Sequence, residues 1–263
     1  MNARFLAKAR ALLSTYYAYM IEYRAELVLW ALSNSLPFIL LGVWHKAAAQ
    51  GEFALSPVEY ARYFLAVFVV RQMTVVWVIW EFEHDIITGR LSFQLLQPVD
   101  PVWRHVSMHA SERLARLPFS FLLVALFFAL YPDSFFVPSL AEAGFAILAM
   151  LLALLLRFLM QYTLAMASFW TERASALEQL WMLPYLFLSG LIGNLQDFPE
   201  PVREVALYTP FPYLVYFPAS LLLGEDVEVA KGLLVIAAWC ALFFALNRLF
   251  WRLGLKRYSA MGA

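Results

Sequence analysis

Residues 143–170 read AGFAILAMLLALLLRFLMQYTLAMASFW, and Arg157 is the only charged side chain in this stretch. An α-helix needs about 20 predominantly apolar residues to cross the hydrocarbon core of a bilayer, so the stretch is long enough to span a membrane. Other runs along the chain have the same character. The sequence therefore predicts six transmembrane helices, at approximately residues 27–45, 60–80, 114–131, 143–170, 177–193 and 229–250.

Lysine and arginine residues gather on alternate sides of these runs. If both termini are cytoplasmic, 13 of them lie on the inner side and 4 on the outer side, while Arg71 and Arg157 fall within runs. An excess of positive charge on cytoplasmic loops orients transmembrane helices during insertion. We therefore predict an all-α polytopic membrane protein with both termini in the cytoplasm.

The composition of the chain supports this class. Of 263 residues, 63% are hydrophobic and 14% are charged, which leaves too few polar residues to cover a soluble domain. Weak strand alternation argues against a membrane barrel. The single cysteine, Cys240, excludes an intrachain disulfide and a cysteine-based metal cluster. Because no repeat or linker interrupts the chain, we expect residues 1–263 to form one domain.

Residues 2–24 mix basic side chains with aromatic and aliphatic ones, and they contain no short apolar segment followed by a cleavage site. This pattern predicts an amphipathic helix that lies on the inner membrane surface. A plain extension of the first transmembrane helix is nearly as good an interpretation.

The inner segment 85–113 is longer than a loop that only reverses direction. It carries an apolar group (Phe93, Leu95, Leu96 and Trp103), and two prolines flank Asp100. We expect a short helix along the membrane that is stopped by a rigid proline turn. Its apolar side chains either pack against lipid headgroups or form a docking surface for a cytosolic partner, and the residues favour neither.

The outer segment 194–226 contains five prolines, which forbid one continuous helix. Two short helices that dip back toward the bilayer are expected, with Thr209, Pro210, Phe211 and Pro212 as the break between them. Non-helical backbone at membrane depth requires cover by protein or by a water-filled cavity, so the segment would cap a vestibule. The alternative is an interfacial belt of aromatic side chains.

Polar side chains within the runs suggest an interior path. Arg157, Gln161 and Ser168 follow one face of the fourth predicted helix, and Arg71 with Thr74 forms a smaller counterpart on the second. No carboxylate is expected at a comparable depth. Either these arginines contact an anionic group such as a lipid phosphate, or they bond to carbonyls at a helix break or extend to a membrane interface.

Catalytic chemistry finds little support in the sequence. His105 and His109 lie one helical turn apart with Glu112 nearby, but a solvated loop face is the favoured interpretation, and no metal site is predicted. The chain lacks the glycine-rich loop that binds nucleotide phosphates, and it has no basic patch for nucleic acid. An ion-coupled carrier or a membrane enzyme that acts on lipids remains an alternative to a transporter driven by a separate ATPase.

Three stretches carry a resemblance to a known family: EYRAELVLWALSNSLPFILLGVW (22–44), TGRLSFQLLQPVDP (88–101) and YTPFPYLVYFPASLLLG (208–224). They are similar to bacterial permeases of the ABC-2 type, and the resemblance extends over essentially the whole chain. It implies an exporter subunit of the bacterial cytoplasmic (inner) membrane that contacts lipid. The subunit would pair with a second permease copy and bind separate ATP-binding cassette ATPase subunits, which hold the ATP and magnesium while this chain binds no cofactor.

The resemblance also implies roles for particular segments. The N-terminal helix would be a connecting helix, and residues 198–224 would form re-entrant helices with an outer gate at Thr209 to Pro212. The inner loop would be the coupling helix that docks on the ATPase, formed by Asp85, Gly89, Arg90, Phe93, Leu95, Leu96, Pro98, Asp100 and Pro101.

Overall fold

The computed structural model describes residues 3–33, 35–48, 55–171 and 173–258, and the regular structure in these ranges is entirely helical. The helices are α1 (Ala3–Glu22), α2 (Arg24–Ser33), α3 (Leu36–Ala48), α4 (Pro57–Thr74), α5 (Val78–Ile87), α6 (Arg90–Leu95), α7 (Val102–Leu130), α8 (Leu140–Ala165), α9 (Ala176–Leu188), α10 (Glu200–Tyr208), α11 (Tyr216–Leu223) and α12 (Val229–Leu255). Short 3₁₀ turns are η1 (Pro132–Ser134), η2 (Met166–Phe169), η3 (Leu195–Asp197) and η4 (Pro212–Leu214).

Four helical stretches in the described ranges are long and apolar enough to cross a membrane. They are Pro57–Ile87, Val102–Leu130, Leu140–Phe169 and Val229–Leu255, and they correspond to four of the six predicted runs. The other two runs form shorter helices. The first is divided between α2 and α3, and the fifth forms α9, which has 13 residues.

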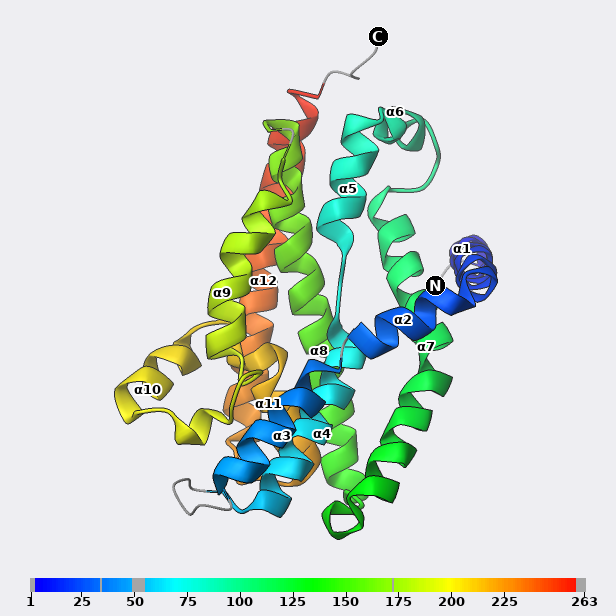
Figure 1. Cartoon of the computed structure of the whole chain (residues 1–263). Helices are drawn as coiled ribbons and strands as arrows, with labels where there is room; N and C mark the ends of the chain where they lie inside the picture. The colour runs from blue at the N-terminus through cyan, green and yellow to red at the C-terminus, as the bar shows by residue number, and fades with distance from the viewer. Residues whose placement is uncertain (1–2, 34, 49–54, 172, 259–263) are drawn as a thin grey trace.

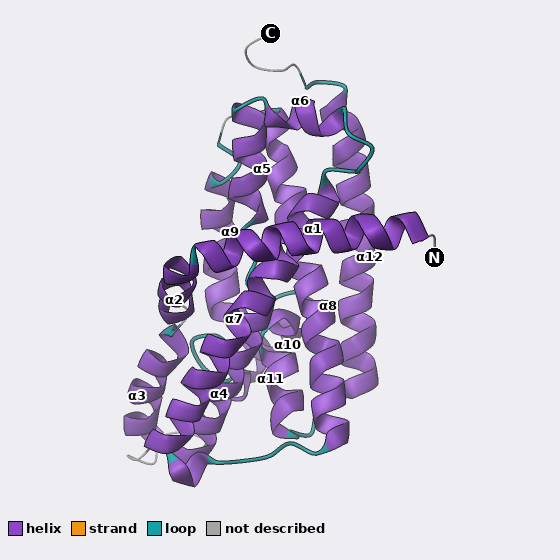
Figure 2. Ribbon diagram, turned by 90° about the vertical axis from the view of Figure 1, so that its right-hand side faces the viewer, coloured by secondary structure: helices purple, strands orange, loops and turns teal. Residues whose placement is uncertain are grey.

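The long helices α7, α8 and α12 extend along the molecule, with α4 and α5 between them (Figure 1). One end carries α6 and the last turns of α12, and we call it the α6 end. The opposite end carries η1, which joins α7 to α8. Helix α1 runs across the long helices instead of along them (Figure 2). It is therefore a separate element and not a straight extension of the first predicted span, as the amphipathic interpretation requires.

Helix α1 is held on α7 by both apolar and polar contacts. Met20 and Leu27 pack against Ala115 of α7 in one buried cluster. The Ser111 hydroxyl of α7 donates a hydrogen bond of 3.0 Å to the Leu13 carbonyl. The crossing is thus fixed by the tertiary structure, and α1 lies at a level between the two ends of the molecule (Figure 2).

Two helices begin with the same capping device at the end that carries η1. Ser56 and Glu59 exchange backbone hydrogen bonds at the start of α4, and Ser139 and Glu142 do so at the start of α8. Such a capping box satisfies donors that the first turn of a helix leaves unpaired. These local signals explain why α4 and α8 start where they do.

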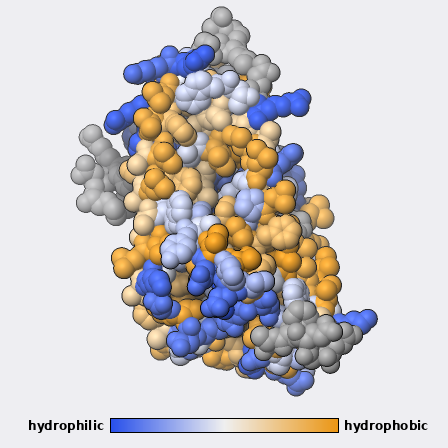
Figure 3. Space-filling view, turned by 90° about the vertical axis from the view of Figure 1, so that its left-hand side faces the viewer, coloured by the Kyte–Doolittle hydropathy of each residue, from blue (hydrophilic) through white to orange (hydrophobic). Residues whose placement is uncertain are grey.

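Helix α4 forms the centre of the bundle. The most apolar 18-residue window of the α4–α5 stretch is 72% buried, whereas the corresponding window of α12 is only 17% buried. The exposed apolar side chains of α7 and α12 are suited to face lipid, since a bilayer is as apolar as they are. On the face shown in Figure 3, apolar side chains fill most of the area between two regions of polar ones, as expected for a membrane protein.

Candidate functional site

A sharp elbow at the α6 end joins α5 to α6. Gly89 adopts a left-handed conformation, with φ of 71°, just before α6 begins, and glycine reaches this region without the steric cost of a Cβ atom. The predicted short helix is present and its apolar side chains divide between two faces. Leu91 is buried against α5, whereas Phe93 is 71% and Leu96 86% exposed, with Leu95 also exposed.

Asp85 lies under this elbow and not on its outer surface. Its carboxylate accepts a hydrogen bond of 2.7 Å from the Gln94 side chain of α6, and the Arg90 guanidinium lies 3.6 Å away. Because Asp85 is buried, its side chain is not part of the exposed surface, and its assignment to the coupling segment stays a prediction. Through this hydrogen bond with Gln94, Asp85 links α6 to α5.

The paired prolines predict a turn between α6 and α7, and the structure has it. Hydrogen bonds with the start of α7 and with α1 hold this turn in place. Asp100 accepts a hydrogen bond from the Val102 backbone, and Pro101 is buried immediately before α7. The exposed Pro98 presents its carbonyl to the Lys8 ammonium of α1 at 3.0 Å. The nine predicted docking residues therefore lie close together at the α6 end, but only some of them are at the surface.

A break in the second predicted span was missed from the sequence. Residues 75–77 are not helical, and they separate α4 from α5. Arg113 of α7 donates hydrogen bonds to the carbonyls of Met73 (2.6 Å), Val75 (2.5 Å) and His109 (2.5 Å). One guanidinium thus donates to two carbonyls at the interrupted end of α4. Backbone carbonyls that are buried in a membrane protein need such donors, because no water is present to bond them.

A buried chain of ionisable side chains connects α5 with α7 beside this break. His105 lies 3.3 Å and His109 3.4 Å from the Glu81 carboxylate, and His109 lies 3.5 Å from Glu112, which also pairs with Arg116. Both histidines are at most 5% exposed, so the expectation of a solvated face is wrong. No group in the described ranges has the arrangement of a metal site.

The polar stripe of α8 faces α9 inside the bundle. Arg157 donates a hydrogen bond of 2.9 Å to the Tyr185 hydroxyl, and Gln161 donates one of 2.8 Å to Glu178. Glu178 is buried near the start of α9 and bonds the stripe one turn beyond Arg157, a carboxylate partner that the sequence did not predict. Ser168 is buried farther along, in η2.

The smaller polar pair lies on the last turn of α4, next to the break. Thr74 is buried and donates a hydrogen bond of 2.9 Å to the Val70 carbonyl of its own helix. Arg71 is partly buried one turn earlier. The structure therefore places both polar sets in the interior, without showing what passes between them.

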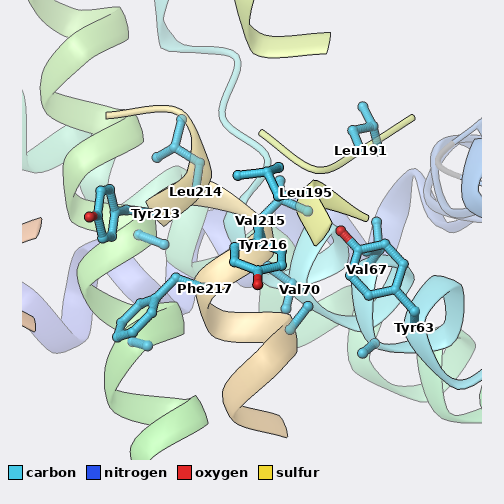
Figure 4. Packing of buried hydrophobic residues seen from close by; sticks show 14 of the residues in the cluster. Tyr63, Val67, Val70, Leu191, Leu195, Tyr213, Leu214, Val215, Tyr216 and Phe217 are labelled. Carbon is cyan, nitrogen blue, oxygen red and sulfur yellow. The ribbon is translucent and has the colours of Figure 1, made fainter. Parts of the chain in front are cut away.

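The outer segment forms two short helices with a break between them at residues 209–215. Helix α10 is largely exposed, whereas residues 212–221 are buried without interruption. Within the break, Thr209 bonds to the Ala206 carbonyl and the Phe211 ring lies 5.0 Å from that of Trp181. Pro210 is buried and Pro212 starts η4. Figure 4 shows Tyr213 to Phe217 enclosed between segments of other helices.

The non-helical backbone after α9 is also covered by side chains. The Tyr63 hydroxyl donates a hydrogen bond of 2.6 Å to the Gly190 carbonyl, and the Trp44 indole donates one of 2.7 Å to Ile192. Beyond α11, Glu225 accepts a hydrogen bond of 2.6 Å from Ser220. Burial raises the pKa of this carboxyl above its ordinary value. The backbone just after α9 and the segment of η4 and α11 are therefore packed inside the protein and do not form a solvated loop.

Comparison with known proteins identifies the family. Residues 51–262 match the family model described as ABC-2 family transporter protein, which covers most of the chain and all of the segments from α4 to α12. No curated protein matches the chain. The helical architecture and the four long apolar helices agree with this match. The chain belongs to the ABC-2 transporter family and is a transmembrane permease of an ABC transporter.

Proposed function

We propose that the chain is the permease subunit of an ATP-driven exporter and that it works as a dimer with a separate ATPase bound at α6. The observation that carries the proposal is the elbow at Gly89, which leaves Phe93, Leu95 and Leu96 exposed. The buried face of the same helix is hydrogen-bonded to α5 through Gln94 and Asp85. Exposed apolar side chains on a rigid base are suited to partner docking. ATP and magnesium would bind to the ATPase, because the sequence of this chain contains no phosphate-binding loop.

The same contacts provide a route by which movement of the ATPase reaches the membrane helices. Gln94 and Asp85 transmit a displacement of α6 to α5, while the proline turn transmits it to α7. Lys8 links the turn to α1. Between α5 and α4 lies the break at residues 75–77, where a hinge motion would change few helical hydrogen bonds.

The remaining parts of the proposal concern the path and the topology. Arg71, Thr74, Arg157, Gln161 and Ser168 would line or support a path next to the dimer cleft. Thr209 to Pro212 would form an outer gate between re-entrant helices. We place the chain in a bacterial inner membrane with lipid around it, with six spans in total and both termini in the cytoplasm. The charge asymmetry of the sequence supports this orientation.

The docking site is tested with Leu96→Asp. A charge at this exposed position should abolish co-purification of the ATPase with the tagged permease and the ATP-dependent transport, without loss of the permease from the membrane. The control is Leu140→Asp, since Leu140 is 95% and Leu96 86% exposed, but Leu140 lies at the opposite end. The assignment is wrong if the Leu96 variant retains the ATPase at wild-type stoichiometry. A wild-type chain that retains no ATPase in mild detergent contradicts the proposed function itself.

A further inference from the structure

A pocket of about 340 Å³ lies between the α1–α2 corner and the helices α5 and α7. We infer that it binds an ammonium group carried on a hydrocarbon chain. Five aromatic side chains line it: Tyr19, Tyr23, Trp30, Trp77 and Trp80. They come from α1, α2 and the residues around the start of α5, so the pocket exists only because α1 crosses the bundle (Figure 2).

The aromatic rings that line the pocket are tilted against one another and do not form one parallel stack. Ring centroids are 5.2 Å apart for Trp30 and Trp77, 5.7 Å for Trp77 and Trp80, and 4.9 Å for Tyr19 and Tyr23. Each pair is tilted by 48° or 49°, so adjacent rings turn their faces in different directions. The negative face of an aromatic ring attracts a cation within about 6 Å, most strongly for tryptophan. Several such faces around one cavity are the arrangement that holds a quaternary ammonium group.

The charges around the pocket favour a cation over an anion. Among the described residues that line it, every charged side chain is a carboxylate: Glu26, Glu81 and Glu112. The nearby cations are directed elsewhere. Arg113 bonds to backbone carbonyls and Arg116 pairs with Glu112.

Two more titratable groups, His105 and His109, contact Glu81, but neither lines the pocket. Glu81 and Glu112 are already paired with these histidines and with Arg116, so the preference for a cation comes from the exposed Glu26, which would attract an ammonium group and repel an anionic headgroup.

The rest of the lining accounts for the hydrocarbon chain. Met20, Leu27 and Met108 supply an apolar surface, and methionine adapts to alkyl chains of varied shape. Tyr19, Trp30 and Trp80 are 40–50% exposed, so the pocket is open to the surroundings of the bundle. A belt of interfacial aromatic residues alone would not require a concave site or three carboxylates. The inference does not rest on ATP-driven export, since the binding needs neither an ATPase nor a second copy.

Binding is measured with the purified full-length chain in nanodiscs of an uncharged glycolipid, with empty nanodiscs as the baseline. The probe is dodecyltrimethylammonium, and its comparison is the neutral isostere in which carbon replaces nitrogen. The cation should bind about tenfold more tightly than the isostere, as expected for desolvated cation–π contacts. Equal affinities of the two probes would overturn the inference.

Variants locate the site. Trp77→Leu and Trp80→Leu should each weaken binding of the cation about fivefold to tenfold, with little change for the isostere. Glu26→Gln, at an exposed position that does not endanger folding, should weaken it as well. The control is Trp170→Leu, because Trp170 is 46% exposed but lies outside the pocket. Wild-type affinity in all three pocket variants would contradict the assignment.

The source of the ammonium group is then distinguished by adding phosphatidylethanolamine to the nanodiscs. Displacement of the probe would identify a phospholipid headgroup as the occupant, and retention would identify a cationic amphiphile instead. Both results support ammonium recognition. Failure of binding would leave the ATPase-docking experiment with Leu96→Asp unaffected, so the two proposals fail separately.

Discussion

At the scale of single residues, the side chains that hold this bundle together are those that satisfy interrupted backbone. Arg113 donates to two carbonyls around the α4–α5 break, while Tyr63 and Trp44 donate to carbonyls after α9. In the apolar part of a membrane protein, each unsatisfied carbonyl is costly. These three residues allow the chain to depart from helical geometry where it changes direction.

Arg113→Met tests this role of a single side chain. The substitution leaves the carbonyls of Met73 and Val75 without their donor, and we expect the free energy of unfolding to fall by about 2–4 kcal/mol. The measurement is thermal unfolding of the purified protein in detergent, compared with Arg252→Met at an exposed position of α12. Equal melting temperatures for the two variants would show that the guanidinium does not stabilise the break.

At the scale of elements, α11 packs mainly on α8 and α4, and its Phe217 side chain reaches α12. Gly232 of α12 faces the Phe217 ring of α11, and a Cβ atom added at Gly232 would overlap that ring. Phe217 is only 5% exposed, so the ring has little room to move away. The contact of the Phe217 ring with α12 therefore requires glycine at this position.

Gly232→Ala should displace the Phe217 ring and destabilise the protein by about 1–3 kcal/mol, the usual cost of overpacking. The control is Gly144→Ala, because a Cβ atom at Gly144 meets no neighbour within 4 Å. Alanine is favoured over glycine within a helix, so the control should be neutral or slightly more stable. Thermal unfolding distinguishes the two variants, and an unaffected Gly232 variant would show that Phe217 has room to repack.

At the scale of the whole molecule, the two ends differ in construction. The α6 end exposes a short helix whose buried face is hydrogen-bonded to α5, whereas toward the other end the non-helical backbone after α9 is covered by buried side chains. The chain crosses between these ends repeatedly through its long apolar helices (Figure 1). The proposed orientation, which the charge asymmetry of the sequence supports, has the α6 end in the cytoplasm.

Cysteine labelling tests this orientation. Cys240 is buried, so the background reaction with a membrane-impermeant maleimide should be low. Val137→Cys and Tyr208→Cys, at positions that are 76% and 83% exposed, should label in intact cells. Leu96→Cys should label only after the membrane is permeabilised. The opposite pattern would reverse the proposed topology.

Local patterns in the sequence were sufficient for several elements. The four longest spans follow from the length of their apolar runs, because any helix with such a surface must be buried or face lipid. Prolines predicted the turn before α7 and the interruption between α10 and α11, since proline cannot continue a helix. The mixed composition of the first residues favoured an amphipathic helix only slightly over an extension of the first span, and the crossing of α1 over the bundle decided between them.

Only the tertiary structure decided how the polar residues are paired. Arg113 lies about 40 positions from the carbonyls that it satisfies, and nothing in the sequence near residues 75–77 marks the break. Asp85, His105 and Glu178 look like solvated or inner-end groups in the sequence, but partners from other elements cover them. Apolar length and proline act locally along the chain and can be read from it. Hydrogen bonds between distant segments depend on which helices become neighbours, so they are decided only when the bundle has packed.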